Sequence, residues 1–313
     1  MTDFRTDVYN KENKERFLAS VGIDKYPNRW WERLFEKSND LEEYRGKDLF
    51  CFTTNEILEF YKILEAKTLS PLLVVNINLM KYGDWGLSEH LVIDGQNHFR
   101  EIDRELLMQC ISKVRLQNSL LLGNSFKEFI NELYNDQDKY IFWCLYEGIK
   151  GKNYEEIINL KMDDIDESKG IVRTCTGRKV KVSQDFINIC KIADKETVYI
   201  SINEKMIEKP LKISGCIYKE KSNSRSIDIK RSVYAAISRN ISYFLNNSSI
   251  SSKTIRDSGL IMALNERAEK YNMTVRELLS VDNVKYCEDI IYKYNFNIDV
   301  KARFCTEYQD YLK

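Results

Sequence analysis

The chain has 313 residues and no net formal charge, because 48 lysines and arginines balance 48 aspartates and glutamates. Its eight cysteines are scattered without a CxxC pair, which argues against a zinc site and a disulfide framework, and we expect no metal or cofactor. No apolar run reaches the length of a membrane span, and residues 1–18 lack the apolar stretch of a signal peptide, so we expect a soluble cytoplasmic protein of two domains.

The first part of the chain is predicted to be helical. Thr53 and Glu56 form a capping box, and apolar residues at helical spacing follow it. Ser70 and Pro71 indicate the start of a second helix. The stretch 72–85 in this helix is apolar almost all round, so we expect it to be central to its domain.

A further helix is expected over 103–120, and the helical pattern then breaks at 121–124. Ser125 and Glu128 have the spacing of a new capping box. We therefore place a domain boundary between residues 120 and 121.

The second part of the chain changes its periodicity. Residues 170–182 alternate around Thr176 and Gly177, which predicts two strands joined by a tight turn. Weaker strand patterns cover 198–202 and 213–218. A helix with a core-facing apolar stripe is expected over 229–244, and helices continue to the C-terminus.

The charge is unevenly distributed. Residues 1–110 hold 15 lysines and arginines against 20 aspartates and glutamates, a balance of −5. With 48 of each sign overall, residues 111–313 hold 33 against 28, a balance of +5. If the protein binds a polyanion, the C-terminal part is expected to supply more of the contacts.

Two segments carry a family resemblance. Residues 146–182 read as a helix, a turn and a basic hairpin, and residues 251–264 contain the run Lys253-Thr254-Ile255-Arg256. In this order they resemble the tyrosine recombinase, or phage integrase, family. Residues 52–60 and 79–85 resemble that family's core-binding domain.

The resemblance implies a mainly α fold with a small β-hairpin or sheet. It also implies two domains: a helical, SAM-like core-binding domain over 1–120 and a catalytic-like domain over 121–313.

The active-site residues of the family are only partly matched. Lys150 stands where the family has an arginine, and Lys cannot grip a phosphate in the bidentate way that Arg does. Lys179 resembles the family's hairpin lysine. In the His-x-x-Arg motif Arg256 matches, but Lys253 replaces the histidine that handles a proton near neutral pH.

The tyrosine position of the family falls near Tyr292, among 19 tyrosines in the chain. The two histidines, His90 and His98, lie in the first domain and cannot supply the missing group. We therefore expect a degenerate active site with no catalytic residue, Tyr292 being a degenerate nucleophile position.

These features predict a sequence-specific protein that binds operator sites in double-stranded DNA and does not cut them. By resemblance it would be a transcriptional repressor that maintains lysogeny, like the repressor of SPbeta-like temperate phages, associated with the host nucleoid. One alternative is an active site-specific recombinase that uses Tyr292 as nucleophile. Another is a helical scaffold that binds only protein. Whether copies self-associate on DNA is left open.

The expected DNA contacts fall into two sets. The resemblance implies Lys150, Lys152, Arg178, Lys179, Lys181, Lys253 and Arg256. A separate basic cluster comprises Lys221, Arg225, Lys230 and Arg231.

Overall fold

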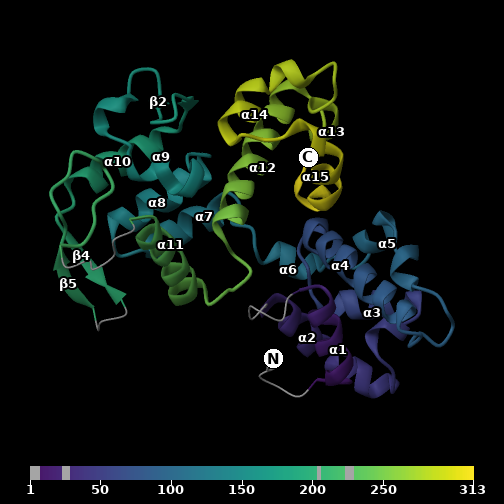
Figure 1. The fold of residues 1–313 in the computed structure, drawn as a ribbon. Helices are drawn as coiled ribbons and strands as arrows, with labels where there is room; N and C mark the ends of the chain where they lie inside the picture. The colour runs from purple at the N-terminus through teal and green to yellow at the C-terminus, as the bar shows by residue number, and fades with distance from the viewer. Residues whose placement is uncertain (1–7, 23–28, 203–205, 223–228) are drawn as a thin grey trace. The chain divides into compact units, whose positions relative to one another are not determined.

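The computed structural model describes residues 8–22, 29–202, 206–222 and 229–313 (Figure 1). The chain divides into two compact units, Met1–Leu116 and Gln117–Lys313. Each unit has its own hydrophobic core. The expected two-domain, mainly helical architecture with small antiparallel sheets is confirmed.

The described part of the first unit contains helices joined by loops, with no β-strand. Thr53 is the N-cap of α3 as expected, and the Glu56 carboxylate accepts from its backbone N–H at 2.8 Å and from its hydroxyl at 2.9 Å. The core is rich in aromatic rings packed against Tyr82 of the longest helix. The elements are α1 (Lys11–Ser20), α2 (Arg29–Arg45), η1 (Leu49–Cys51), α3 (Thr54–Ile63), α4 (Leu69–Ser88), η2 (His98–Glu101), α5 (Arg104–Met108) and α6 (Lys113–Gln117).

Helix α4 differs from expectation in its start and its burial. It begins at Leu69 after Thr68, so Ser70 is not its cap, although Pro71 does lie in the first turn. One stripe of α4 is buried, whereas Val74 and Ile77 are 51% and 54% exposed. The apolar pattern therefore overstated how deeply this helix is buried.

The single helix expected over 103–120 is wrong. Asp103 caps α5, which ends at Met108, and α6 begins only at Lys113. Between them the backbone N–H of Ser112 donates to the carbonyl oxygen of Ala66 at 2.8 Å. This bond to a segment distant in sequence replaces a helical one, so tertiary structure overrides the helical pattern here.

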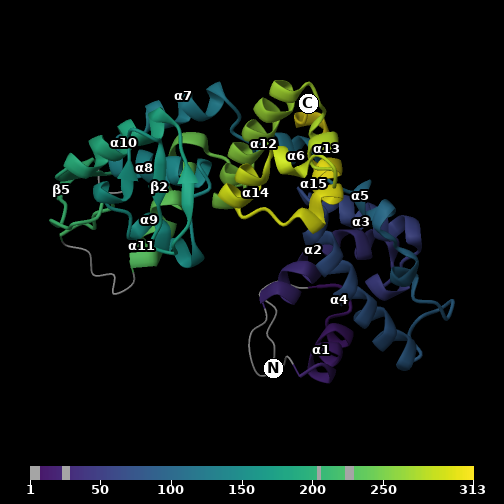
Figure 2. The same cartoon turned by 90° about the horizontal axis from the view of Figure 1, so that it is seen from above.

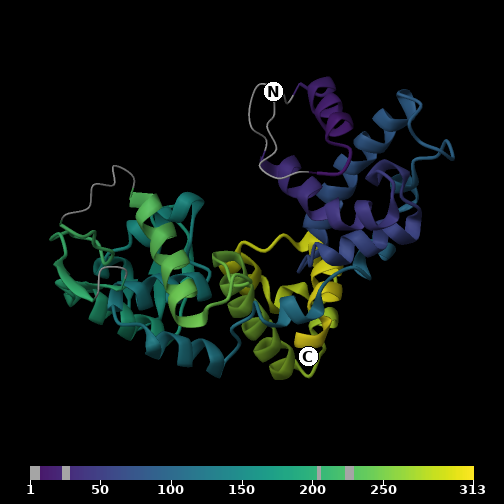
Figure 3. The ribbon, with the colours of Figure 1, turned by 90° about the horizontal axis from the view of Figure 1, so that it is seen from below.

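The second unit is built around α8, whose side chains are nearly all buried. Helices α10, α11 and α12 pack against it. Helix α12 also contacts α13 and α14, so it joins the α8 group to the C-terminal helices (Figures 2 and 3). The α-helices are α7 (Asn124–Glu132), α8 (Asp136–Tyr146), α9 (Glu155–Ile158), α10 (Gln184–Lys195), α11 (Ile229–Asn240), α12 (Ser252–Tyr271), α13 (Val275–Leu278), α14 (Glu288–Tyr294) and α15 (Lys301–Glu307). Short turns are η3 (Lys152–Tyr154), η4 (Met162–Asp164), the π-helical η6 (Ile241–Leu245), η7 (Val284–Tyr286), η8 (Ile298–Val300) and η9 (Gln309–Tyr311).

The capping box expected at Ser125 is also wrong. Helix α7 begins one residue earlier, at Asn124, after Gly123 in a positive-φ conformation of 50°. The hydroxyl of Ser125 donates to the carbonyl oxygen of Leu122 instead of capping the helix. A glycine turn therefore starts this helix, since glycine adopts positive φ without strain.

The hairpin expected over 170–182 is confirmed. Strands β2 (Ile171–Arg173) and β3 (Lys179–Lys181) pair antiparallel, with Val172 opposite Val180 and both buried. A third strand, β1 (Ile165–Asp166), pairs with β2 and was too short to be recognised by alternation.

The second sheet is a ribbon of β4 (Val198–Ser201) and β5 (Ile207–Pro210), which confirms a strand at 198–202. The strand expected at 213–218 is wrong, because that segment is irregular and Ile213 is fully exposed. None of the described helices is long and apolar enough to cross a membrane.

Candidate nucleic-acid interface

Arg178 does not project toward solvent. Its Nε and Nη2 donate to the two carboxylate oxygens of Glu156 at 2.8 and 2.5 Å. Its remaining N–H groups reach the carbonyl oxygens of Gly148 (3.0 Å), Tyr292 (3.3 Å) and Lys293 (2.9 Å). An arginine has five N–H donors, and all five are used inside the protein.

Arg178 therefore acts as an internal clamp, whereas the sequence predicted a DNA contact. It joins the hairpin to α9, to the end of α8 and to the last turn of α14. Glu156 is 1% exposed and Arg178 is 19% exposed at the side chain. The Arg178 guanidinium helps lower the pKa of Glu156 against the opposing effect of burial, which is the largest influence.

Arg256 and Lys150 form a second, more open cluster at the start of α12. The Arg256 Nη2 lies 3.6 Å from Asp257 Oδ1, and its buried Nε has no hydrogen-bond partner among the described residues. Half-burial of Lys150, followed by the nearby Arg256 charge, lowers the pKa of its ammonium. The Lys150 Nζ lies 5.3 Å from the centre of the Tyr154 ring. Two cations that repel each other, one with a donor unused, favour an anion between them.

Lys253, which the resemblance sets against the family's histidine, forms an ion pair within its own helix. Its Nζ lies 2.6 Å from Asp257 Oδ2, which also accepts from the Tyr308 hydroxyl at 2.9 Å. Lys253 remains 60% exposed, so it can still approach a phosphate. It is an ammonium beside a carboxylate, which is a poor substitute for an imidazole as a proton donor and acceptor.

Three lysines near the hairpin are exposed as expected. Lys179 and Lys181 flank the buried Val180 on β3, so both point to the solvent face. Lys152 is exposed in the turn before α9. Within the described part of the chain none of these three lysines forms an ion pair.

Tyr292 lies on α14 with its side chain 51% exposed. It lines a hollow of about 700 Å³ together with Lys179 and Lys181. Arg256 and Lys150 are not among the residues that line this hollow. The structure thus brings Tyr292 together with the hairpin lysines, and the matched arginine belongs to a different cluster.

The separate basic cluster is only partly assembled. Lys230 and Arg231 are exposed on the first turn of α11. Lys221 differs from them, because its Nζ lies 4.0 Å from the centre of the Tyr199 ring and lines a pocket. Arg225 falls outside the described residues.

Sequence reasoning missed a basic stripe in the first unit. Arg29, Arg33 and Lys37 recur every four residues along α2, and all three are exposed. None of them forms an ion pair with another described residue. Side chains at this spacing share one helix face, so they form a positive row despite the acidic balance of the domain. The four-residue spacing of these three cations in the sequence could have predicted the stripe.

His98 lies between two carboxylates of its own segment, which indicates a structural role. Its ring nitrogens lie 2.7 Å from Asp94 Oδ2 and 3.0 Å from Glu101 Oε1. The hydrogen bond to Asp94, opposed by burial and reinforced by Glu101, raises the pKa of His98.

We expect His98 to stabilise the protein more at acidic than at alkaline pH. Because its folded pKa is raised, its contribution is fully present below its unfolded pKa of about 6.5 and is lost as pH rises through the folded pKa. The difference in unfolding free energy between wild type and His98→Gln should therefore shrink from about pH 6 to pH 8. Urea unfolding at each pH measures it, and a constant or growing difference contradicts the assignment.

Comparison with known proteins agrees with this architecture. A core-binding unit joined to a hairpin-containing catalytic-like unit defines a tyrosine-recombinase-like protein. Residues 122–308 match the family described as "MrpR, C-terminal catalytic domain", and residues 8–88 match "MrpR, N-terminal core-binding domain". The chain belongs to the MrpR family. It is also 25% identical over 318 residues, covering 97% of this chain and 94% of the relative, to the "SPbeta prophage-derived uncharacterized protein YopR" of Bacillus subtilis (strain 168).

Proposed function

We propose that this protein binds specific duplex-DNA sites without cutting them and acts as a phage repressor. The observation that carries the proposal is the contrast between the two arginines of the site. Arg178 is consumed by internal bonds, whereas Arg256 keeps a buried donor unused beside Lys150. Such a site retains cations that can hold a phosphate but lacks the second arginine that a transferred phosphate requires.

The basic residues that remain available lie on several elements. Phosphate contacts fix a protein on the duplex, and contacts to base edges supply the sequence information. The hairpin lysines, the Arg256 cluster and the basic turn of α11 would supply contacts from the second unit, and the α2 stripe would supply contacts from the first. Prophage origin of the YopR relative supports the repressor assignment.

Binding is expected to weaken steeply with salt. About six phosphate contacts release enough counterions to reduce affinity by about 10³ between about 50 and 200 mM salt. Footprinting on phage DNA would locate the sites, and a salt titration on one of them would measure the slope. Affinity that barely changes with ionic strength would favour the protein-binding scaffold.

Replacing Arg256 by Ala is expected to raise the dissociation constant by about 10- to 100-fold, since a charge-assisted hydrogen bond contributes about 1.5–3 kcal/mol. The matched control is Arg267→Ala on the same helix, whose guanidinium already binds Asp289 at 2.7 and 2.8 Å. That control should bind DNA normally. If Arg256→Ala instead melts earlier and binds normally when folded, Arg256 is a structural residue.

A working recombinase is the second candidate. The observation in its favour is that Tyr292 is exposed beside Lys179 and Lys181 in one hollow. A covalent-trapping assay separates it from the repressor.

A further inference from the structure

Residues 301–313, called the strap below, comprise α15 and η9 and lie along α12. The Tyr308 hydroxyl donates to Asp257 Oδ2 at 2.9 Å, in the second turn of α12. About two turns farther along the helix, Asn265 Oδ1 accepts from the backbone N–H of Lys313 at 3.0 Å. These two anchors hold the strap against α12, and the first of them lies next to the candidate DNA contacts.

Asp257 is a buried carboxylate beside the cations at the start of α12, and it is 4% exposed. Its Oδ2 accepts from Lys253 Nζ at 2.6 Å and from the Tyr308 hydroxyl. Its Oδ1 lies 3.6 Å from Arg256 Nη2, which is longer than the usual hydrogen-bond distance of about 2.7–3.2 Å. Both short contacts of Asp257 are therefore on one oxygen, and Arg256 is only loosely paired.

Arg178 shows how a carboxylate occupies an arginine. Glu156 accepts from it with both oxygens, at 2.8 and 2.5 Å. This two-bond geometry is the one that arginine and a carboxylate prefer. If both oxygens of Asp257 turned toward Arg256, they would compete with a DNA phosphate for its guanidinium. Tyr308 opposes that rotation, because its hydroxyl holds Oδ2 on the side of Lys253.

Tyr308 is suited to hold a carboxylate in a fixed orientation. Its side chain is 1% exposed, and its ring packs against Phe304 with the ring centres 4.8 Å apart. Burial, reinforced by the Asp257 charge, raises the pKa of the Tyr308 hydroxyl, so the hydroxyl stays protonated and donates. A buried hydroxyl needs a hydrogen-bond partner, and Asp257 provides it.

We propose that Tyr308 is a positioning residue for DNA binding, which holds the Asp257 carboxylate so that Arg256 stays available to a phosphate. This inference rests on the proposed DNA binding. It adds that the strap sets the affinity of the site through Asp257, without a contact of its own to DNA. A change that lifts the strap from α12 is therefore expected to weaken DNA binding.

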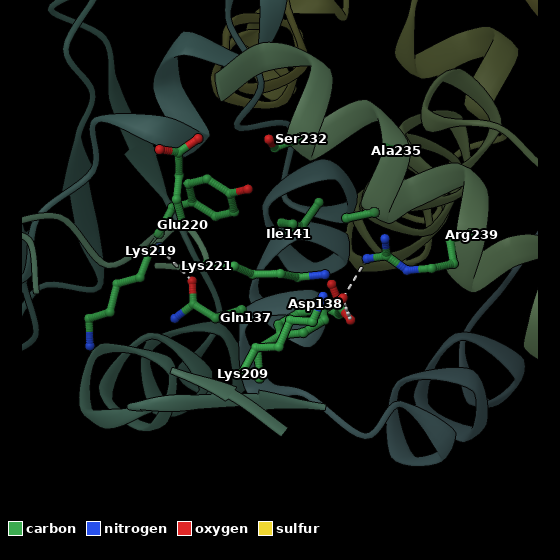
Figure 4. A pocket seen from close by; sticks show the side chains of 13 residues that line it. Gln137, Asp138, Ile141, Lys209, Lys219, Glu220, Lys221, Ser232, Ala235 and Arg239 are labelled. Atoms are coloured by element: carbon green, nitrogen blue, oxygen red, sulfur yellow. Dashed lines mark hydrogen bonds between the residues drawn. The ribbon is translucent and has the colours of Figure 1, made fainter. Parts of the chain in front are cut away.

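A second pairing of a tyrosine with an aspartate in the same unit supplies a control. The Tyr199 hydroxyl donates to Asp138 Oδ2 at 2.8 Å and accepts from Arg239 Nη2 at 2.5 Å. Asp138 and Arg239 line a pocket between α8 and α11 (Figure 4). Asp138 is 1% exposed, so Tyr199→Phe, like Tyr308→Phe, removes a buried hydroxyl bonded to a buried aspartate. The Asp138 pair, however, does not adjoin Arg256.

The test measures binding of the full chain to its footprinted DNA site over a range of salt concentrations. Stoichiometric titration with the site gives the active fraction of each protein. Tyr308→Phe is expected to raise the dissociation constant by about three- to tenfold. The slope of log affinity against log salt should shrink by up to about 0.9, because one phosphate contact is weakened. Tyr199→Phe should lose stability but keep the affinity and slope of wild type.

Asp257→Asn separates positioning from a general loss of stability. The amide has the same shape but no charge, so it competes less well with a phosphate for Arg256. Asp257→Asn should therefore bind the site at least as tightly as wild type, and adding Tyr308→Phe should cause no further loss. A tyrosine with a purely structural role would weaken binding equally in both backgrounds, and that result would overturn the proposal.

The remaining outcomes are also decisive. If wild type binds its site and Tyr308→Phe binds it equally well, or no worse than Tyr199→Phe, the positioning role is wrong and the proposed DNA binding stands. Failure of wild type to bind duplex DNA would overturn both. If Tyr308→Phe does not fold, a folded Asp257→Asn protein that binds more weakly than wild type overturns the proposal, since Asp257 would then not compete with phosphate.

Discussion

Replacing Arg178 by Ala is expected to lower the unfolding free energy by about 3–5 kcal/mol, the range observed when one partner of a buried ion pair is removed. The substitution leaves Glu156, which is 1% exposed, without its guanidinium. It also removes the donors to the carbonyl oxygens of Gly148, Tyr292 and Lys293. Urea unfolding monitored by circular dichroism measures the change. The last turn of α14 should lose amide protection first, because Arg178 is its link to the hairpin.

Lys179→Ala is the matched control for Arg178→Ala. Lys179 is the next residue in the hairpin and is exposed, so its removal should change stability by no more than about 0.5 kcal/mol. It should instead weaken DNA binding. If Arg178→Ala were as stable as this control but bound DNA poorly, Arg178 would be a DNA contact after all.

Local sequence signals predicted much of the fold. The helix start at Thr53 and the hairpin over 170–182 depend on residues close together in the chain, and both are confirmed. The wrong helix over 103–120 and the wrong strand at 213–218 depend on distant partners. Ser112 bonds Ala66, and β4 pairs with β5 rather than with the later segment. Periodicity carries no information about such partners.

The sequence predicted which residue types lie at the candidate site better than it predicted which residues contact one another there. The pattern placed Arg178 beside Lys179 in a basic turn, where solvent exposure is the ordinary expectation. Its actual partners are Gly148, which follows α8, Glu156 of α9 and two residues of α14, and the partners on α14 are more than a hundred residues away in the chain. A side chain's role as a clamp depends on that assembly, which a single sequence does not reveal.

The basic stripe on α2 illustrates the opposite error, in which exposed cations were overlooked. Net charge averages over a domain, and residues 1–110 are acidic overall. Arg29, Arg33 and Lys37 nevertheless share one exposed face. A partner such as DNA senses the local potential within about 10 Å at ordinary salt, so a short positive row can matter more than the domain's total charge.

Strand cleavage requires several positive groups in fixed positions around the attacked phosphate. A tyrosine attacking a phosphodiester needs a preorganised set of cations around the developing charge, and loss of one such donor typically lowers the rate by about 10²–10³. The family resemblance implies that Lys150 stands in place of one arginine and Lys253 in place of the histidine. Arg178 cannot substitute, because its donors are used internally. The losses do not multiply simply, but each removes part of the same stabilisation.

We therefore expect no covalent adduct between this protein and a nicked suicide substrate carrying its own binding site, and we expect Tyr292→Phe to bind that site like wild type. Denaturing electrophoresis detects the phosphotyrosyl band directly. Tyr294→Phe is the neighbouring control, and it should cost stability because its buried hydroxyl donates to the carbonyl oxygen of Tyr146 at 2.8 Å. A band that forms with wild type and disappears in Tyr292→Phe would establish a working recombinase. It would also mean that a lysine can serve where the family uses arginine, since Lys150 would then have to stabilise the attacked phosphate.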